Sequence, residues 1–400
     1  MTQISMSSPD LTEAEIEAVL DVLKSNHLSL GPRVGEFEDQ FARYVGTRHA
    51  VAVSSGTAAL HLSLIASGVG EGDLVVTSPF SFVASANCVL YEHAVPIFVD
   101  VDPTTGNIDP TLVRAAVEDL TVGGGRERRW LPPSLRDAAS FEATLKAILP
   151  VHAFGQPADM QPIADVAQAH GLSTIEDACE AIGAEYNGGR AGTFGDAACF
   201  AFYPNKQMTT GEGGMIVTND GQFARTCSSL RNQGRDVFDA WLSHTRLGYN
   251  YRLTDMACAL GTVQLSRLDE MLAKRARVAG WYTERLRGLA RVHPPATVAT
   301  TSRMSWFVYV VRFDSVEERT GAMNDLASRG IPSRPYFTPI HLQPFYVQRF
   351  GYRRGDFPVT EALGDTSLAL PFSSVMTEEQ VDRVCRELAT IVGQLIVRNI

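Results

Sequence analysis

FAFYPNKQMTTGEGGMIVTND, residues 200–220, is the most informative stretch of this sequence. Its apolar beginning is typical of a buried β-strand, and Pro204 ends that pattern. Lys206 follows almost at once, and a glycine-rich turn then leads into a second apolar run. The stretch therefore predicts two strands joined by a loop that carries one lysine.

Short apolar runs alternate with helical patterns from about residue 45 to 220. Seven of these runs read as strands: VAVSS (51–55), LVVTS (74–78), VPIFVDV (95–101), ILPVHAF (148–154), STIEDA (173–178), ACFAFY (198–203) and GMIVTN (214–219). Strands separated by crossover helices form a mostly parallel sheet covered on both faces, so the sequence predicts an α/β fold with seven strands. Sites in such sheets lie at the carboxyl ends of the strands. Polar residues follow several runs at that edge, among them Ser54 to Thr57, Ser78, Asp100, His152 and Glu176-Asp177.

The pattern changes after Arg246, where long helical segments replace the alternation. A strand-like run, WFVYVVRF (306–313), a helix around residues 322–329 and a closing helix from Thr377 predict a smaller α+β unit. We therefore expect a large α/β domain over residues 1–245, beginning with a helix, and a smaller α+β domain over residues 246–400. Triple glycine, a proline pair and charge mark residues 120–140 as a surface insertion.

Composition excludes several classes of protein. The chain is 45% hydrophobic and 20% charged, as in ordinary globular proteins, and its net charge of −10 argues against a nucleic-acid surface. No apolar run approaches the ~18 residues of a membrane span, and residues 1–20 show no secretory signal, so we expect a cytoplasmic protein. The six cysteines and nine histidines lack metal-ligand spacing, so no metal site is expected.

Lysine is scarce in this chain, because only four of the 35 basic residues are lysines. A lysine retained in an arginine-rich sequence can serve chemistry that guanidinium cannot perform, since only an amine forms an imine. Lys24, Lys146 and Lys274 lie on patterns with helical apolar spacing. Lys206, in its loop between two strands, is the candidate for chemistry.

Three features fit one cofactor, pyridoxal 5′-phosphate. Lys206 would hold its aldehyde as a Schiff base, and Asp177, which ends the run STIED, would keep its ring nitrogen protonated. Gly56 and Thr57 open a helix, where free amides and the helix dipole favour a phosphate. Taken alone, the aspartate reads as a helix cap and the glycine turn as a capped helix start. Their order along one domain is more specific than any single part.

The sequence resembles the DegT/DnrJ/EryC1/StrS sugar aminotransferases, a family of fold-type I pyridoxal-phosphate enzymes. The resemblance covers nearly the whole chain and rests on long motifs: GPRVGEFEDQFARYVGTRHAVAVSSGTAALHLSL, SPFSFVASANCVLYEHAVPIFVDVD, PVHAFGQPADM, IEDACEAIGAEYNGGRAGTFGDAACFAFYPNKQMTTGEGGMIVTND, LRNQGRD, LGYNYRLTDMACALGTVQL and RPYFTPIHLQPFY. It implies a large, mostly parallel sheet domain and a smaller C-terminal α+β domain.

The resemblance also implies roles for particular residues. Lys206 matches the Schiff-base lysine, Asp177 the partner of the pyridine nitrogen, and Gly56 and Thr57 the phosphate ligands. Phe82 matches the aromatic residue that stacks on the cofactor, and Asn250 an asparagine that reaches the phosphate in the neighbouring subunit, which implies a homodimer with shared sites. Glu180 stands beside the cofactor, where glutamate resembles the perosamine-synthase type that aminates C4. Tyr336 and His341 lie in a late motif that resembles a substrate-side loop.

Two departures from the family pattern stand out. Ala201 occupies the position, five residues before the lysine, of a serine that usually binds the phosphate. One hydrogen bond to the phosphate is therefore expected to be missing. The insertion at residues 120–140 is the second departure, and no function is assigned to it.

The resemblance predicts an aminotransferase that moves an amino group from glutamate to a keto carbon of a nucleotide-linked deoxysugar, through a pyridoxamine form of the cofactor. C4 is the expected position, and C3 amination is an alternative. A dehydratase of the same fold is a second alternative, although such members typically carry histidine in place of Lys206. A pyridoxal-phosphate-binding regulator without turnover is a remote third.

Overall fold

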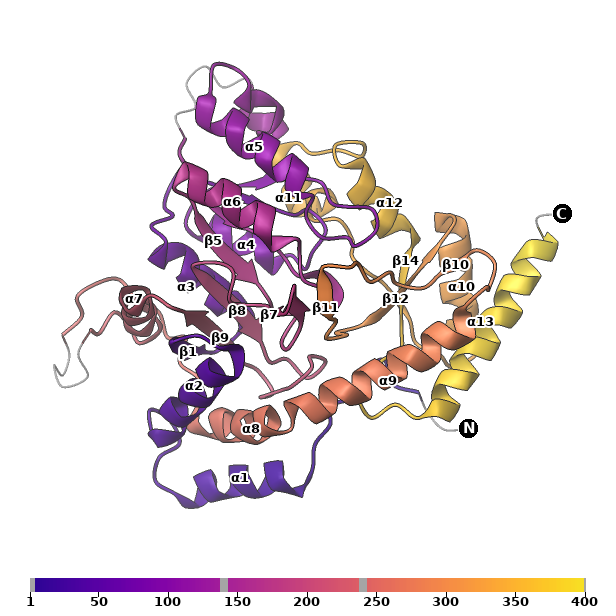
Figure 1. The fold of residues 1–400 in the computed structure, drawn as a ribbon, viewed down its shortest axis with the longest axis horizontal. Helices are drawn as coiled ribbons and strands as arrows, with labels where there is room; N and C mark the ends of the chain where they lie inside the picture. Colours follow the sequence, from indigo (N-terminus) through magenta and orange to yellow (C-terminus); the bar gives the residue numbers. More distant parts are fainter. Residues whose placement is uncertain (1–3, 137–142, 237–242, 399–400) are drawn as a thin grey trace.

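The computed structural model describes residues 4–136, 143–236 and 243–398 of the chain. Its main feature is a seven-stranded sheet in the order β1-β9-β8-β5-β4-β2-β3. Strands β1, β9, β8 and β5 of this sheet are labelled in Figure 1. The strands are β1 (His49–Val53), β2 (Leu74–Thr77), β3 (Val95–Phe98), β4 (Leu145–Leu149), β5 (Ser173–Asp177), β8 (Ala197–Ala201) and β9 (Gly214–Thr218). All seven predicted strands are present. Six of them run in the same direction, and β9 runs in the opposite direction between β1 and β8. The α/β fold class is confirmed.

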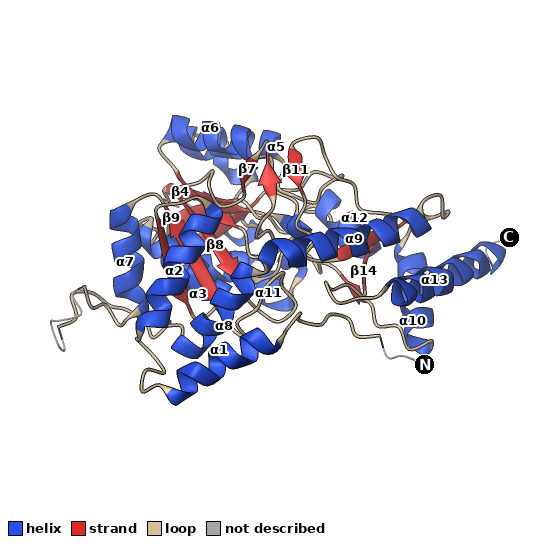
Figure 2. Ribbon diagram, turned by 60° about the horizontal axis from the view of Figure 1, so that its bottom comes forward, coloured by secondary structure: helices blue, strands red, loops and turns tan. Residues whose placement is uncertain are grey.

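Helices cover both faces of this sheet (Figure 2). One face packs against α3 (Gly56–Ala66), α4 (Ala84–Tyr91) and α7 (Gly221–Arg231). The other packs against α2 (Pro32–Val45), α5 (Pro110–Val122), α6 (Met160–His170), α8 (Asp255–Ser266) and α9 (Leu268–Leu286). Strand residues alternate between the faces, since Val51 and Val53 join the first core and Ala52 the second. The amphipathic α1 (Glu13–Lys24) lies outside, on α8.

A second sheet has four antiparallel strands in the order β10-β12-β14-β13. Its strands are β10 (Val292–His293), β12 (Tyr309–Phe313), β13 (Arg334–Pro335) and β14 (Ser367–Leu370). Helices α9, α10 (Val316–Ser328) and α13 (Glu378–Arg398) pack on this sheet and complete its core. Two further helices, α11 (Pro344–Phe350) and α12 (Pro358–Thr366), lie between β13 and β14 in the sequence. This is the predicted α+β part. A small sheet of β11 (Thr301–Arg303), β6 (Glu185–Tyr186) and β7 (Gly189–Arg190) was not predicted.

The long helix α9 runs from the side of the large sheet to the smaller one (Figure 1). The preceding helix α8, which the prediction assigned to the smaller domain, packs into the core of the large sheet through Cys258 and Leu265. The boundary that we predict between the two domains, at residues 245 and 246, therefore stays a prediction. Among the described residues, no helix combines the length and apolar character that crossing a membrane requires.

Three local predictions meet different outcomes. Lys146 was expected on a helix, and this is wrong, because residues 145–149 form β4 between β2 and β5. The helix expected around residues 322–329 begins at Val316, where Ser315 caps it by accepting from the Glu318 amide. In the predicted insertion, two short 3₁₀ turns follow α5, and residues 137–140 lie outside the described residues.

Candidate active site

A cavity of about 460 Å³ opens where β5 and β8 end and α3 begins. Seven of the nine predicted site residues line it: Gly56, Thr57, Phe82, Asp177, Glu180, Lys206 and Tyr336. This is the carboxyl edge at which open parallel sheets place their ligands. The topology therefore brings together residues that lie far apart in the sequence.

Lys206 lies in the loop after β8, held by a turn in which its amide donates to the Tyr203 carbonyl at 2.9 Å. Its side chain is 13% exposed, and Nζ lies 3.7 Å from Glu180 Oε1. On another side Nζ lies 3.9 Å from the centre of the Phe307 ring. The amine is thus inside the cavity, loosely paired with one carboxylate and one aromatic face.

Asp177 ends β5 and is 5% exposed. Ser85 Oγ donates to its Oδ2 at 2.7 Å, and the Cys179 amide donates to its Oδ1 at 3.2 Å. No helix begins after it, because a turn follows. The carboxylate is therefore oriented by its neighbours toward the cavity, and the ordinary role of helix cap does not apply.

Glu180 is buried beside Lys206 and accepts a hydrogen bond from the Phe154 amide at 2.9 Å. Burial raises the pKa of this carboxyl group, and the nearby Lys206 opposes that effect. The raised pKa widens the pH range in which the Glu180 carboxyl is protonated.

The beginning of α3 forms the other end of the cavity. Ser55 caps the helix by accepting from the Ala58 amide at 3.1 Å, and the next amides, of Gly56 and Thr57, belong to the first turn, which has no intrahelical acceptors. A Cβ on Gly56 would lie 2.7 Å from Ala201 Cβ and 2.8 Å from Cys179 Sγ, so only glycine fits. Ala201 itself lines the cavity with a methyl group.

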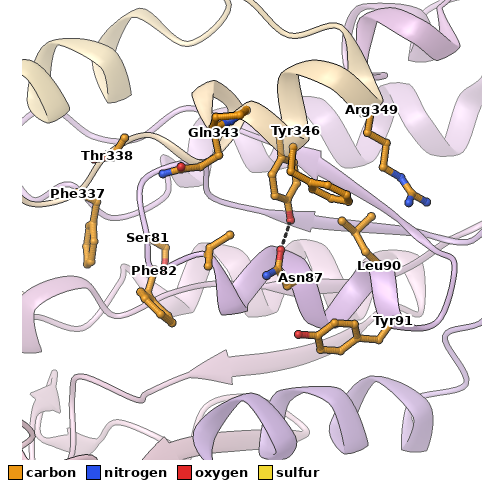
Figure 3. Close-up of a pocket in the computed structure, with 13 residues that line it drawn as sticks. Ser81, Phe82, Asn87, Leu90, Tyr91, Phe337, Thr338, Gln343, Tyr346 and Arg349 are labelled. Atoms are coloured by element: carbon orange, nitrogen blue, oxygen red, sulfur yellow. Dashed lines mark hydrogen bonds between the residues drawn. The ribbon is translucent and has the colours of Figure 1, made fainter.

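Phe82 is 64% exposed and stands at the wall shared with a second cavity of about 810 Å³. Helix α4 and residues 337–349 line this second cavity, and Figure 3 shows Tyr346 donating to Asn87, which joins the two parts of the lining. Arg349 reaches its rim from α11. The two cavities are therefore neighbours around Ser81 and Phe82.

Two predicted residues lie elsewhere. Asn250 is exposed outside the cavity, and its backbone pairs with Asn232. His341 is fully buried and pairs with Glu361 at 3.0 Å, and burial lowers its pKa. It lines neither cavity, so these contacts give its predicted substrate role no support.

Several lining residues were missed by sequence reasoning, among them Ser85, Tyr203, Asn205 and Phe307, whereas Ser55 belongs to the stretch expected at this edge. Ser85 lies within SFVASAN, only three residues after Phe82, so its position near the site could have been predicted from the sequence. Nothing in the sequence around Phe307 indicates a place in the site, because its apolar run is typical of a strand in the hydrophobic core.

These residues fit pyridoxal phosphate. The cavity offers the groups that this cofactor requires: an amine for the aldehyde, a carboxylate for the ring nitrogen, a helix start that is too tight for any side chain at Gly56, and an aromatic wall. In the described part of the chain, no cluster of three or more histidine, cysteine or acidic side chains is arranged to hold a metal ion. The fold and the site define a pyridoxal-phosphate enzyme.

The chain belongs to the DegT/DnrJ/EryC1/StrS aminotransferase family, whose model matches residues 9–389. It is 40% identical to a GDP-perosamine synthase of Caulobacter vibrioides over 391 residues, covering 97% of this chain and 98% of that protein. A GDP-perosamine synthase of Escherichia coli O157:H7 is 34% identical, covering 97% and 98%. The solved structure of DesV from S. venezuelae superposes with a TM-score of 0.85 at 32% identity, covering 98% and 99%. The protein is thus a pyridoxal-phosphate-dependent sugar aminotransferase.

Proposed function

We propose that this enzyme transfers an amino group from glutamate to the C4 keto carbon of a nucleotide-linked deoxysugar. The observation that carries the proposal is one cavity containing Lys206, Asp177 and Glu180 beside a second cavity with room for a nucleotide. Relatives named GDP-perosamine synthase support the substrate class. Glu180, beside the lysine, supports C4 through the resemblance of that position to the perosamine-synthase type. A cytoplasmic location is part of the same proposal.

The cofactor's place follows from the lining residues. Lys206 would hold it covalently, Asp177 would face its ring nitrogen, the amides of Gly56 and Thr57 its phosphate, and Phe82 the face of its ring. Pyridoxal phosphate supplies an electron sink that stabilises negative charge on the carbon next to the amino group. The protein's own task is to hold that carbon in reach of a base.

Lys206 is the base that the geometry favours. Once the amine of the donor has replaced Lys206 on the cofactor, Nζ would be a free amine and would take the proton from the donor's α carbon. In the second half-reaction it would deliver a proton to the sugar carbon that receives nitrogen. Glu180 Oε1, 3.7 Å from Nζ, is near enough to orient the amine without holding it in a close ion pair.

The second cavity supports a substrate with a nucleotide. The guanidinium of Arg349 at its rim suits a diphosphate, and the half-exposed ring of Phe345 in the same lining offers aromatic surface to a base. Because this cavity adjoins the one that contains Lys206, a nucleotide there leaves its sugar near the amine.

A homodimer with shared sites is part of the proposal. Tyr249 and Tyr251, on either side of Asn250, stack on each other and contact His61 of α3, while Asn250 stays exposed. An exposed side chain between two anchored neighbours is well placed to reach a second subunit.

Mixing two inactive variants tests the shared site. After subunit exchange, Lys206→Ala and Asn250→Ala proteins should regain activity, since each mixed dimer has one site with both native residues. Exchange is monitored by mass spectrometry of differently tagged subunits, and exchange without recovery contradicts the shared site.

The reaction itself is tested with glutamate and a panel of nucleotide-linked 3-keto and 4-keto deoxysugars. We expect a 4-amino product, identified by mass and by NMR of the sugar ring. A 3-amino product would refute the C4 assignment, a product lacking a hydroxyl would indicate a dehydratase, and bound cofactor without turnover on any sugar would indicate a regulator.

A further inference from the structure

Arg275, on α9, is a fully buried arginine outside the cavity, with 1% exposure. Its guanidinium donates only to backbone carbonyls. Nη1 donates to Trp306 and Phe307, both at 3.1 Å, and Nη2 donates to Lys206 at 2.8 Å and to Asn205 at 3.4 Å. One side chain thus binds two separate segments, residues 205–206 and residues 306–307.

Both segments carry groups of the active site. Lys206 supplies the amine, and Phe307 supplies the ring whose centre lies 3.9 Å from that amine. By fixing the carbonyls of both residues, the guanidinium fixes the relative position of the amine's backbone and its aromatic partner.

Ion pairing does not account for this arginine. Among the described residues, none of its hydrogen bonds goes to a carboxylate, and Nε has no partner. Burial lowers its pKa to about 10, which reflects the cost of removing the charge from water. A buried cation without a hydrogen-bonded carboxylate is expensive, and three kinds of contact offset that cost: four carbonyls, the Phe372 ring, whose centre lies 5.6 Å from Cζ, and the attraction of Asp10. A planar guanidinium with five donors suits that task, whereas an ammonium does not.

The segment around Phe307 is also held from its other edge. The amides of Ser305 and Phe307 donate to the carbonyls of Gly155 and Phe154, at 3.0 and 3.1 Å. A Cβ on Gly155 would lie 2.7 Å from the Trp306 nitrogen, so this approach requires glycine. Residues 305–307 are thus held by residues 154–155 on one side and by Arg275 on the other, and the same guanidinium holds residues 205–206.

We propose that Arg275 is a positioning residue that sets Lys206 against Phe307 and so fixes the direction of the amine. The proposal rests on the proposed role of Lys206 as the residue that holds the cofactor. The guanidinium acts through the backbone and touches neither cofactor nor substrate.

Hydrogen exchange of the apo-protein gives a test that does not involve the cofactor. In Arg275→Met, which keeps an apolar stem without donors, the amides of residues 203–210 and 305–309 should exchange together, about tenfold faster than in the wild type. Arg285→Met is the matched control, because Arg285 lies on the same helix and pairs with Glu378 and Asp382 of α13. It should leave both segments unchanged. Unchanged exchange in Arg275→Met, or faster exchange spread evenly over the protein, overturns the proposal.

The bound cofactor gives a spectroscopic readout. Arg275→Met should still bind it covalently, with wild-type visible absorbance, but its visible circular dichroism should fall by about half, since the orientation of the amine is less fixed. Full dichroism would overturn the proposal. Arg275→Lys, which keeps some donors, should give intermediate values in both experiments and serves if the methionine variant does not fold. If reduction and peptide mapping place the cofactor on another lysine, the proposed function fails, while the exchange experiment still tests the contacts of Arg275.

Discussion

Charged groups are arranged differently near the start of α9 and in the cavity that contains Lys206. Near the start of α9, Arg267 pairs with Asp10 at 2.7 Å and with Glu15 at 2.6 Å, and Lys274 pairs with Asp10 at 3.0 Å. In the cavity, Lys206 stays 3.7 Å from Glu180. Close pairs hold α1 and the segment before it in place, whereas the loosely paired amine remains available to form a bond. The separation of charges distinguishes the structural lysine from the chemical one.

The largest expected difference in turnover is between the variants that replace each of the two lysines, Lys206 and Lys274. Lys206→Ala should lower turnover by more than about 1000-fold, because covalent attachment and the base are lost together. Lys274→Ala should keep near-wild-type turnover and lose about 1 kcal/mol of stability with its ion pairs. Turnover is measured with glutamate and the accepted sugar, and stability by urea unfolding. Comparable activity losses in both variants would contradict the distinction.

Asp177→Asn should lower turnover by about 100-fold, because an amide no longer favours a protonated ring nitrogen. The melting temperature should change little, since the amide oxygen can still accept from the Cys179 amide while the new NH2 group donates to the Ser85 hydroxyl. Ser85→Ala, which removes one of these donors, is the matched control and should have a smaller effect. A near-native rate for Asp177→Asn would mean that the carboxylate is structural, like those paired with Arg267.

The ion pairs near the start of α9 predict a dependence of stability on pH. Although burial alone would raise it, hydrogen bonds from Thr12, Gln264 and Arg267 lower the pKa of Glu15 to about 2, from an ordinary value of 4.5. A carboxyl whose pKa is lower in the folded state stabilises the protein above its unfolded pKa, and this contribution is lost as the pH falls from about 4.5 to 2. Glu15→Gln should therefore cost about 1 to 3 kcal/mol at pH 7 and flatten the decline below pH 5. Urea unfolding across this range measures both, and an equally steep decline in the variant would refute the assignment.

The smallest expected effect is that of Ala201→Ser on cofactor binding. A hydroxyl here would add a hydrogen bond to a charged phosphate oxygen, so cofactor binding should tighten by up to about tenfold. A bridging water displaced by the hydroxyl would make the gain smaller. The cofactor dissociation constants of the two apo-proteins decide this, and weaker binding in the serine variant would contradict a family-like phosphate site.

The sequence predicts all seven strands of the large sheet, because parallel strands buried on both faces are short continuous apolar runs. Lys146 shows the limit of such reasoning. FEATLKAIL (141–149) has helical spacing, but residues 145–149 pair with β2 and β5, and tertiary pairing outweighs a local pattern. Strands of two or three residues, as in β6 and β7, leave no pattern to detect.

The candidate site was predictable where a residue type itself carries the chemistry. An imine needs an amine, which singles out Lys206, while Asp177 is predicted from its place in the order of glycine turn, aspartate and lysine and from the family resemblance. Phe307 and Arg275 could not be selected in this way, because their roles depend on carbonyls and rings contributed by segments far away in the sequence. His341 belongs to a motif near the site, but its contacts are with buried Glu361.

β1 is the first strand of the large sheet to leave the ribosome, and within the described residues it pairs with β9, the last. At about 5 to 20 residues per second, the nascent β1 waits on the order of ten seconds or more for its partner. Until then Gly56, just after β1, cannot be held against Ala201 at the end of β8, because β9 lies between those two strands. A nascent chain that ends before residue 218 therefore cannot yet bring the start of α3 against the end of β8, the place proposed for the cofactor phosphate.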